Sequence, residues 1–311
     1  MSTMTLCDVC GAVIAKSAKS CPHCGATNKK PIYKRVWFWL LILLAVILFS
    51  PGGSDNTAGG SMVDNNDVTV AEAVLYDRDG VRMTVTGMET TFNGVDINVL
   101  VENNTTKNLA VSCDDFVVNG ITMYGYMYVD VAAGMKTNDA ISFSNDRLAQ
   151  AGIGKISTVE SYRAALVDTD SFMSIKEIDF EITTSAFDYV QILDDSGDVL
   201  FDQKGFTVIA KTLAKEFYGG SAIVLIKNNT GKDIIVQDDN VSINGYTVSS
   251  LCSADIPNGS ARFVELDVSE SELEENGIEE IETITFTLNV INPTNFDNYF
   301  NTGVLKMTVA N

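Results

Sequence analysis

Short segments of residues 68–311 alternate apolar and polar residues with a period of two. Residues 96–101, 178–183 and 284–288 show this alternation, and their apolar positions hold Ile, Val, Phe and Leu. The pattern is typical of a β-strand with one buried face, and these residues favour strands. Asn-Gly pairs at 119–120 and 244–245 suit tight turns between strands, because both residues accept a positive φ. We predict a mainly β fold.

The pattern occurs twice, at an offset of 125 residues. Matching segments are Val74–Asp77 with Val199–Asp202 and Asn103–Thr105 with Asn228–Thr230. The offset holds without a gap across most of both copies, which indicates an internal duplication. About seven short strands and one helical turn per copy favour an immunoglobulin-like antiparallel β-sandwich over a small open barrel. We expect two tandem sandwich domains, at 68–190 and 191–311.

The chain before residue 68 follows another pattern. Residues 36–49 are fourteen apolar residues without charge, glycine or proline. They are apolar on every side, whereas a helix in a protein core is usually amphipathic. Trp37 and Trp39 suit a membrane interface, and Lys34 and Arg35 can reach the headgroups. We predict one transmembrane helix over 32–50, held in membrane lipid; a buried core helix and a cleaved signal peptide are the alternatives.

Charge is divided unevenly around this stretch. Residues 1–50 carry six basic residues and one acidic residue, and the remainder carries 15 basic and 40 acidic residues. Positive charge before a span places the N-terminus in the cytoplasm. We expect a single-pass protein of the cell membrane with an extracytoplasmic C-terminal region, joined through a flexible linker at 51–67. The net charge of −20 disfavours nucleic acid as a partner.

Two Cys-x-x-Cys pairs, each followed by glycine, lie near the N-terminus: Cys7 with Cys10, and Cys21 with Cys24. Four thiolates at this spacing can surround Zn²⁺ in a tetrahedron, which leaves no open position for substrate. Because so short a segment cannot bury a sufficient core, metal binding would stabilise it. We predict a structural zinc ribbon over 1–28, with His23 as a spacer; a thioredoxin-like redox pair is the less favoured interpretation.

The stretch from CDVCG to CPHCG, running into IYKRVWFWLL, resembles the heads of bacterial zinc-ribbon-domain single-pass membrane proteins. The resemblance covers about residues 1–50, and its four cysteines, Pro22 and the two glycines are all present. It implies a bacterial membrane protein with structural zinc in the cytoplasm. The group shares no single activity, so the resemblance implies no reaction.

Candidate chemistry beyond residue 50 is sparse. His23 is the only histidine in the chain, which excludes Ser-His and Cys-His nucleophile pairs from the larger part. The acidic segment 194–198 offers alternate oxygen ligands for Ca²⁺ but lacks the glycine and distal glutamate of an EF-hand, so a solvated linker is favoured. Cys113 and Cys252 occupy non-equivalent positions of the two copies. They are buried thiols or a bridge, and thiols are favoured.

Tyr124, Tyr126 and Tyr128 alternate along one predicted strand and would share one face of it. Aromatic residues in such a row are enriched at binding interfaces, although a partly covered sheet face is the commoner meaning. The second copy has Ser249, Leu251 and Ser253 at the equivalent positions. A binding role would therefore belong to the first copy alone.

These features predict a membrane-anchored, non-enzymatic binding or sensing protein of the cell envelope. Outside the cell it would bind a protein or another envelope component of unknown identity, and inside the ribbon would contact a cytoplasmic protein. Two alternatives stay open, an envelope enzyme built on carboxylates and a passive structural spacer. A β-sandwich hosts many functions, so the fold class cannot choose between them.

Overall fold

The computed structural model describes residues 4–6, 13–15, 23, 65–216 and 219–309. The chain divides into two compact units, residues 1–59 and residues 60–311, and each is described by itself. In the first unit, β1 (Met4–Leu6) pairs antiparallel with β2 (Val13–Ala15), and Leu6 lies opposite Val13. The side chain of Ile14 is buried. The second unit contains both copies of the duplication.

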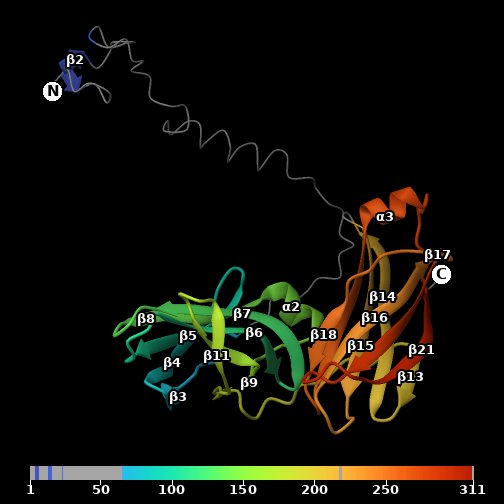
Figure 1. The fold of residues 1–311 in the computed structure, drawn as a ribbon, viewed down its shortest axis with the longest axis horizontal. Coiled ribbons are helices and arrows are strands. Elements are labelled where there is room, and N and C mark those ends of the chain that lie inside the picture. The colour runs from blue at the N-terminus through green and yellow to red at the C-terminus, as the bar shows by residue number, and fades with distance from the viewer. Residues whose placement is uncertain (1–3, 7–12, 16–22, 24–64, 217–218, 310–311) are drawn as a thin grey trace. The chain divides into compact units, whose positions relative to one another are not determined.

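In the first copy, two layers of strands enclose one core (Figure 1). One layer has the order β3 (Ala73–Arg78), β4 (Val81–Thr90), β5 (Gly94–Asn103) and β8 (Lys136–Ser144). The other contains β6 (Leu109–Val118), β7 (Ile121–Val131), β9 (Thr158–Tyr162), β10 (Ala164–Asp168), β11 (Met173–Ile178) and β12 (Glu181–Thr183). Phe116 and Phe143 meet edge to face between the layers, with ring centroids 5.3 Å apart.

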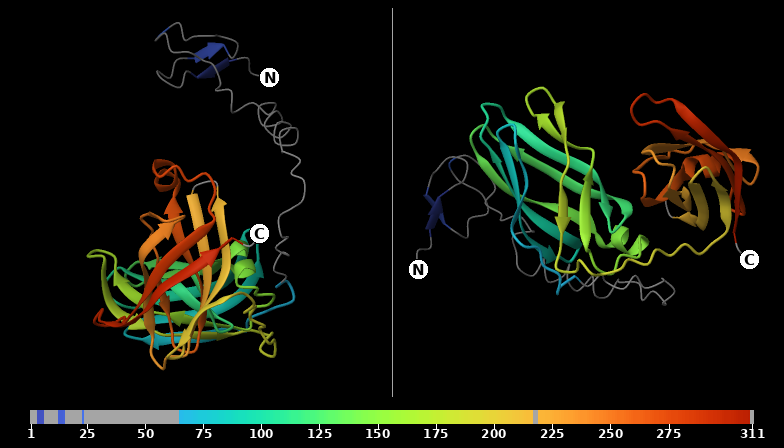
Figure 2. Two further views of the ribbon diagram at one scale, coloured as in Figure 1. Left: turned by 90° about the vertical axis from the view of Figure 1, so that its right-hand side faces the viewer. Right: turned by 90° about the horizontal axis from the view of Figure 1, so that it is seen from below.

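The second copy has the same layered arrangement and a core of its own (Figure 2). One layer contains β13 (Val199–Gln203), β14 (Phe206–Glu216), β15 (Gly219–Asn228) and β19 (Ala261–Ser269). The other contains β16 (Ile234–Ile243), β17 (Tyr246–Thr247), β18 (Ser253–Ile256), β20 (Thr283–Ile291) and β21 (Asn298–Thr308). The short helices α2 (Asn145–Gln150) and α3 (Glu270–Glu275) follow β8 and β19.

The offset of 125 residues recurs in the bounds of the elements: β6 matches β16, β8 matches β19, and α2 matches α3. The turn before β7 and its counterpart also match in their contacts. Asn119 and Asn244 both have a positive φ, at 52° and 51°. Asn119 Nδ2 donates to the Lys155 carbonyl at 2.7 Å, and Asn244 Nδ2 donates to the Glu280 carbonyl at 2.8 Å. The same side chain therefore fastens the same loop in each copy.

The pairing of the sheets corrects the predicted fold class. We predicted two tandem antiparallel sandwiches, but a parallel pairing of β7 with β19 joins strands of both copies into one sheet of 14 strands. The other sheet of the second copy has five strands. Thr122 Oγ1 and Ser260 Oγ lie 2.8 Å apart in buried surroundings beside the pairing, and Ala261 N donates to the Gly120 carbonyl. These contacts satisfy polar groups where the strand ends meet.

The predicted transmembrane helix is also corrected. Within the described residues the structure has two helices of six residues each, and neither is long and apolar enough to cross a bilayer. The fourteen apolar residues at 36–49 would reach about 21 Å as a helix, less than the roughly 30 Å of a bilayer core. The predicted span, 32–50, itself lies outside the described residues, as do residues 51–64 of the predicted linker 51–67 and most of the predicted ribbon. The described fold is thus mainly β without a membrane-spanning element.

Candidate functional site

The three predicted tyrosines lie on one exposed face of β7. Tyr124, Tyr126 and Tyr128 are 48%, 53% and 38% exposed, and the residues between them face the core of the first copy. We call these three side chains the tyrosine face. Gly125 lies behind it, where a Cβ atom would come within 2.8 Å of both Phe116 and Phe143. Only glycine lets the strand carry tyrosines outward while this aromatic pair packs inward.

A cavity of about 500 Å³ opens beside the tyrosine face, and we call it the tyrosine hollow. Strands β5, β7 and β8, the turn before β5, and helix α2 contribute to its wall. Its lining residues are Thr91, Asn93, Gly94, Asp96, Tyr124, Tyr126, Ser142, Phe143, Ser144 and Arg147. Most of these side chains end in a hydroxyl, amide or carboxylate, whereas Tyr124 and Tyr126 also bring aromatic rings. The turn beside the hollow carries Phe92, which is 91% exposed.

Strand register extends this surface across four strands. Tyr126 on β7 lies opposite Ser142 on β8, and Ser142 lies opposite Asp96 on β5. Asp96 in turn lies opposite Glu89 on β4. Directly opposed residues of paired strands point to the same side of a sheet, so these four side chains form one row. A second cavity of about 440 Å³ shares Asp96 and is lined by Thr86, Glu89, Asp96, Asn98, Val99, Asn138, Asp139 and Ala140.

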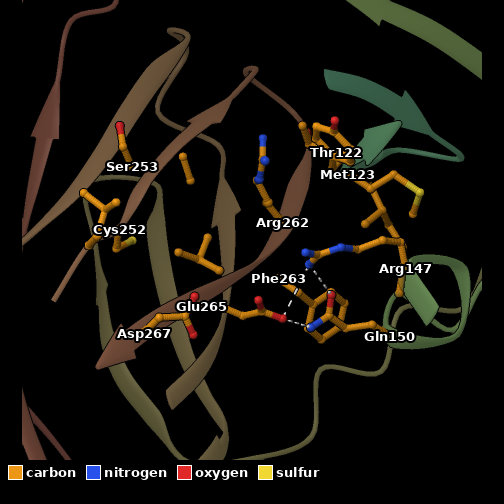
Figure 3. Close-up of a pocket in the computed structure, with 16 residues that line it drawn as sticks. Thr122, Met123, Arg147, Gln150, Cys252, Ser253, Arg262, Phe263, Glu265 and Asp267 are labelled. Carbon is orange, nitrogen blue, oxygen red and sulfur yellow. Dashed lines mark hydrogen bonds and ion pairs between the residues drawn. The ribbon is translucent and has the colours of Figure 1, made fainter. Parts of the chain in front are cut away.

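A third cavity, of about 250 Å³, lies where the two copies meet (Figure 3). Arg147 and Gln150 of α2 point toward Glu265 of β19. Gln150 Nε2 donates to Glu265 Oε1 at 2.6 Å, and Arg147 Nη1 lies 3.4 Å from the same oxygen. Tyr124 and Arg147 line both this cavity and the tyrosine hollow. The second copy therefore fixes a side chain that borders the hollow in the first.

Two further ion pairs cross this junction. Arg262 Nη1 lies 2.9 Å from Asp115 Oδ1, and Arg163 Nη1 lies 2.9 Å from Asp255 Oδ1. Arg262 Nη1 also donates to the Asp255 carbonyl. Burial raises the pKa of Asp115, and the Arg262 guanidinium acts in the opposite direction. The junction thus combines these ion pairs with apolar packing, in which Leu193 and Phe263 contact clusters of both copies.

Cys113 and Cys252 are free and buried, which answers the question that the sequence left open. Burial raises the pKa of each thiol to about 12, so neither is a ready nucleophile or metal ligand at neutral pH. By the offset of 125 residues, Cys113 matches Asp238 and Met127 matches Cys252. Cys113 lies opposite Met127 in the first copy, whereas in the second Cys252 N donates to Oδ1 of Asp238. The same two neighbouring positions thus hold one cysteine in each copy, at the first position in the first copy and at the second position in the second copy.

The acidic segment 194–198 is partly neutralised by lysines. Asp194 lies 3.3 Å from Lys211 Nζ, and Asp195 lies 2.6 Å from Lys227 Nζ. Hydrogen bonds from Ser196 and Lys211 lower the pKa of Asp194 to about 2. Across the described parts of the chain, no three His, Cys, Asp or Glu side chains gather in a way that could hold a metal ion. Cys7, Cys10, Cys21 and Cys24 lie outside those parts, so the zinc site stays a prediction.

Sequence reasoning missed most of the tyrosine hollow. The alternation along β7 pointed to the tyrosines, but Asp96, Ser142 and Asn93 come from segments that no local pattern linked to them. Only the register of β5 with β8 brings Asp96 opposite Ser142. One residue of the hollow does stand out in the sequence: Gly94 recurs as Gly219 in the second copy.

Comparisons with known proteins identify no family. No family model matches the chain, and no curated protein matches it. A conserved domain protein from Bacillus anthracis has a TM-score of 0.28 at 11% identity, over 82% of this chain and 96% of that one. The exo-β-D-glucosaminidase CsxA has a TM-score of 0.24 at 14% identity, over 76% of this chain and 26% of its own. Red sea bream transglutaminase has a TM-score of 0.20 at 10% identity, over 78% and 31%.

Proposed function

We propose that this protein is a non-enzymatic binding protein that recognises its ligand with the first copy of the duplication. The supporting observation is the tyrosine face, three exposed aromatic side chains that continue into the tyrosine hollow. Exposed tyrosines supply contact area with little loss of side-chain entropy, and their hydroxyls can still form hydrogen bonds. Neighbouring hydroxyl, amide and carboxylate groups would then orient the ligand.

The duplication supplies an internal comparison for this proposal. Ser249, Leu251 and Ser253 stand at the positions that match the tyrosines. The strand that is continuous as β7 in the first copy is divided into β17 and β18 in the second. The two copies thus share a scaffold but differ at one surface. Such a difference fits a binding role in which one copy contacts the ligand and the other supports it.

The test compares two triple variants of the full-length protein. The first replaces Tyr124, Tyr126 and Tyr128 by alanine. The matched control replaces Ser249, Leu251 and Ser253 by alanine. Each purified protein is incubated with insoluble polymer, lipid and soluble-protein fractions of the cells that produce it. We expect one fraction to retain the parent and the control, and to retain the tyrosine variant about tenfold less. Equal retention of both variants, or no retention of the parent, would contradict the proposal and favour a passive spacer.

We also propose that the four N-terminal cysteines bind one structural zinc ion. The described pairing of β1 with β2 supports this, because an isolated two-stranded hairpin of three residues per strand is marginal in water without a further constraint. Elemental analysis of the full-length protein should find about one Zn²⁺ per chain. The double variant Cys7→Ser, Cys10→Ser should lose it, whereas Cys113→Ser should retain it. Equal zinc content in both variants would contradict the assignment.

A further inference from the structure

We propose that the ligand of the tyrosine hollow is a non-anionic oligosaccharide. This inference rests on the proposed binding function and specifies its ligand. A sugar ring presents C–H groups on its faces and hydroxyls around its rim. The hollow offers the complementary set, with the rings of Tyr124 and Tyr126 beside Asp96, Asn93 and Ser142. Aromatic faces attract the C–H groups, and carboxylate and amide groups accept or donate hydrogen bonds at the hydroxyls.

The length of the surface favours a short chain of sugars over a single one. The row from Tyr126 through Ser142 and Asp96 to Glu89 crosses four paired strands. Three spacings between neighbouring strands correspond to about 14 Å. Asp96 borders both the tyrosine hollow and the cavity next to it, so one extended ligand can occupy both.

Charge excludes anionic sugars and other polyanions. Asp96 lies in the tyrosine hollow, and the adjoining cavity adds Glu89 and Asp139. Arg147 is the basic residue in the lining of the hollow, and its guanidinium is already paired with Glu265 at 3.4 Å. A ligand with carboxylate, phosphate or sulfate groups would meet repulsion along this row. An uncharged or amine-bearing oligosaccharide would not.

The same surface fits a protein partner less well. Interface anchors on proteins are large apolar or aromatic side chains that enter desolvated, mostly apolar sockets. Phe143, the large apolar residue in the lining of the hollow, is buried in the core, and the exposed Phe92 lies on the adjoining turn outside the lining. Hydroxyl, amide and carboxylate groups form most of the lining instead. A protein ligand is therefore the competing result, and retention by the soluble-protein fraction would reveal it.

The experiment is calorimetric titration of the full-length protein with a panel of linear trisaccharides. The panel contains uncharged glucose, mannose and N-acetylglucosamine trimers, the glucosamine trimer, and an anionic galacturonate trimer. We expect at least one uncharged or amine-bearing trimer to bind and the galacturonate trimer not to bind. Tyr126→Ala should weaken binding about tenfold, and Asp96→Asn should weaken it severalfold. Tyr246→Ala removes a tyrosine of similar exposure, 52%, from the second copy and should leave binding unchanged.

The outcomes separate this inference from the proposed function. Failure of every uncharged and amine-bearing trimer would overturn the oligosaccharide assignment. If the soluble-protein fraction still retained the parent but not the triple tyrosine variant, the binding function would stand with a protein ligand. Binding of a trimer that Tyr126→Ala and Asp96→Asn leave unchanged would overturn the placement of the site. Circular dichroism and urea denaturation of each variant show whether a lost signal reflects lost folding.

Discussion

Replacing Asn228 by leucine is expected to lower the free energy of unfolding by about 2–4 kcal/mol. Asn228 is fully buried, and its Nδ2 donates to the carbonyls of Lys232 and Ile256 at 2.9 and 2.8 Å. Its Oδ1 accepts from the backbone N–H of Thr230 at 3.1 Å. Leucine has a similar shape but no polar atoms, so the buried Ile256 carbonyl and the two part-buried groups of Lys232 and Thr230 would lose their partner. Urea denaturation measures the change.

Two comparisons make this prediction specific. Asn229→Leu changes the adjacent exposed residue and should alter stability by less than about 0.5 kcal/mol. Asn103→Leu should reproduce the large effect, because Asn103 Nδ2 donates to the carbonyls of Lys107 and Val131 in the first copy. If the variants at 228 and 229 lost the same stability, the contacts of the buried amide would not be the cause.

The asparagine contacts also show why much of the fold could be predicted. The Asn-Asn-Thr segments and the Asn119-Gly120 turn each shape a local turn, as in the hydrogen bond from Thr105 N to Asn103 Oδ1, so this part of their chemistry is visible as a local pattern. Because the same pattern returns after 125 residues, each copy supports the interpretation of the other. Alternation then indicates which side chains face the core, as for Ile97, Val99 and Val101. Local periodicity and repetition are both properties of the sequence itself.

The corrected parts depend on contacts between distant residues. The parallel pairing of β7 with β19 involves Ile121 with Ala261 and Thr122 with Arg262, residues 140 positions apart. Two pairs of residues leave no periodic signal in either segment. The ion pair of Arg262 with Asp115 also leaves no signal in the sequence, because the local pattern around each residue is that of an exposed charged residue. The predicted transmembrane helix was based on the apolar character of residues 36–49 on every side, and a run of apolar residues alone does not specify where it is buried.

The candidate site likewise has one part that local pattern predicts and one part that depends on contacts between distant residues. The tyrosine face was visible because alternation within one strand places Tyr124, Tyr126 and Tyr128 on one side. The opposite wall of the hollow was not visible in the sequence, because Asp96 lies opposite Ser142 only through the register of β5 and β8. Register follows from the packing of a whole layer, so a binding surface that crosses strands needs the structure.

Gly94→Ala is expected to lower the free energy of unfolding of the first copy by about 2–4 kcal/mol. A Cβ atom on Gly94 would lie 1.9 Å from the Phe143 carbonyl oxygen and 2.9 Å from Ser144 Cα. Both are backbone atoms of β8, so no side chain can rotate away and the strands must separate. The φ of Gly94, +156°, adds strain for any residue with a side chain. Urea denaturation again measures the loss.

Gly87→Ala is the matched control, because a Cβ atom there would meet its nearest neighbour, Asn98 Nδ2, at 4.0 Å. Its effect on stability should stay within about 0.5 kcal/mol, and a loss equal to that of Gly94→Ala would refute the role of close strand approach. Gly94 also lines the tyrosine hollow, two residues before Asp96. Separation of β5 from β8 would move Asp96 away from Ser142 and Tyr126, so Gly94→Ala should weaken ligand binding even where the protein remains folded. The residue that permits the strand contact thereby also determines the geometry of the binding surface.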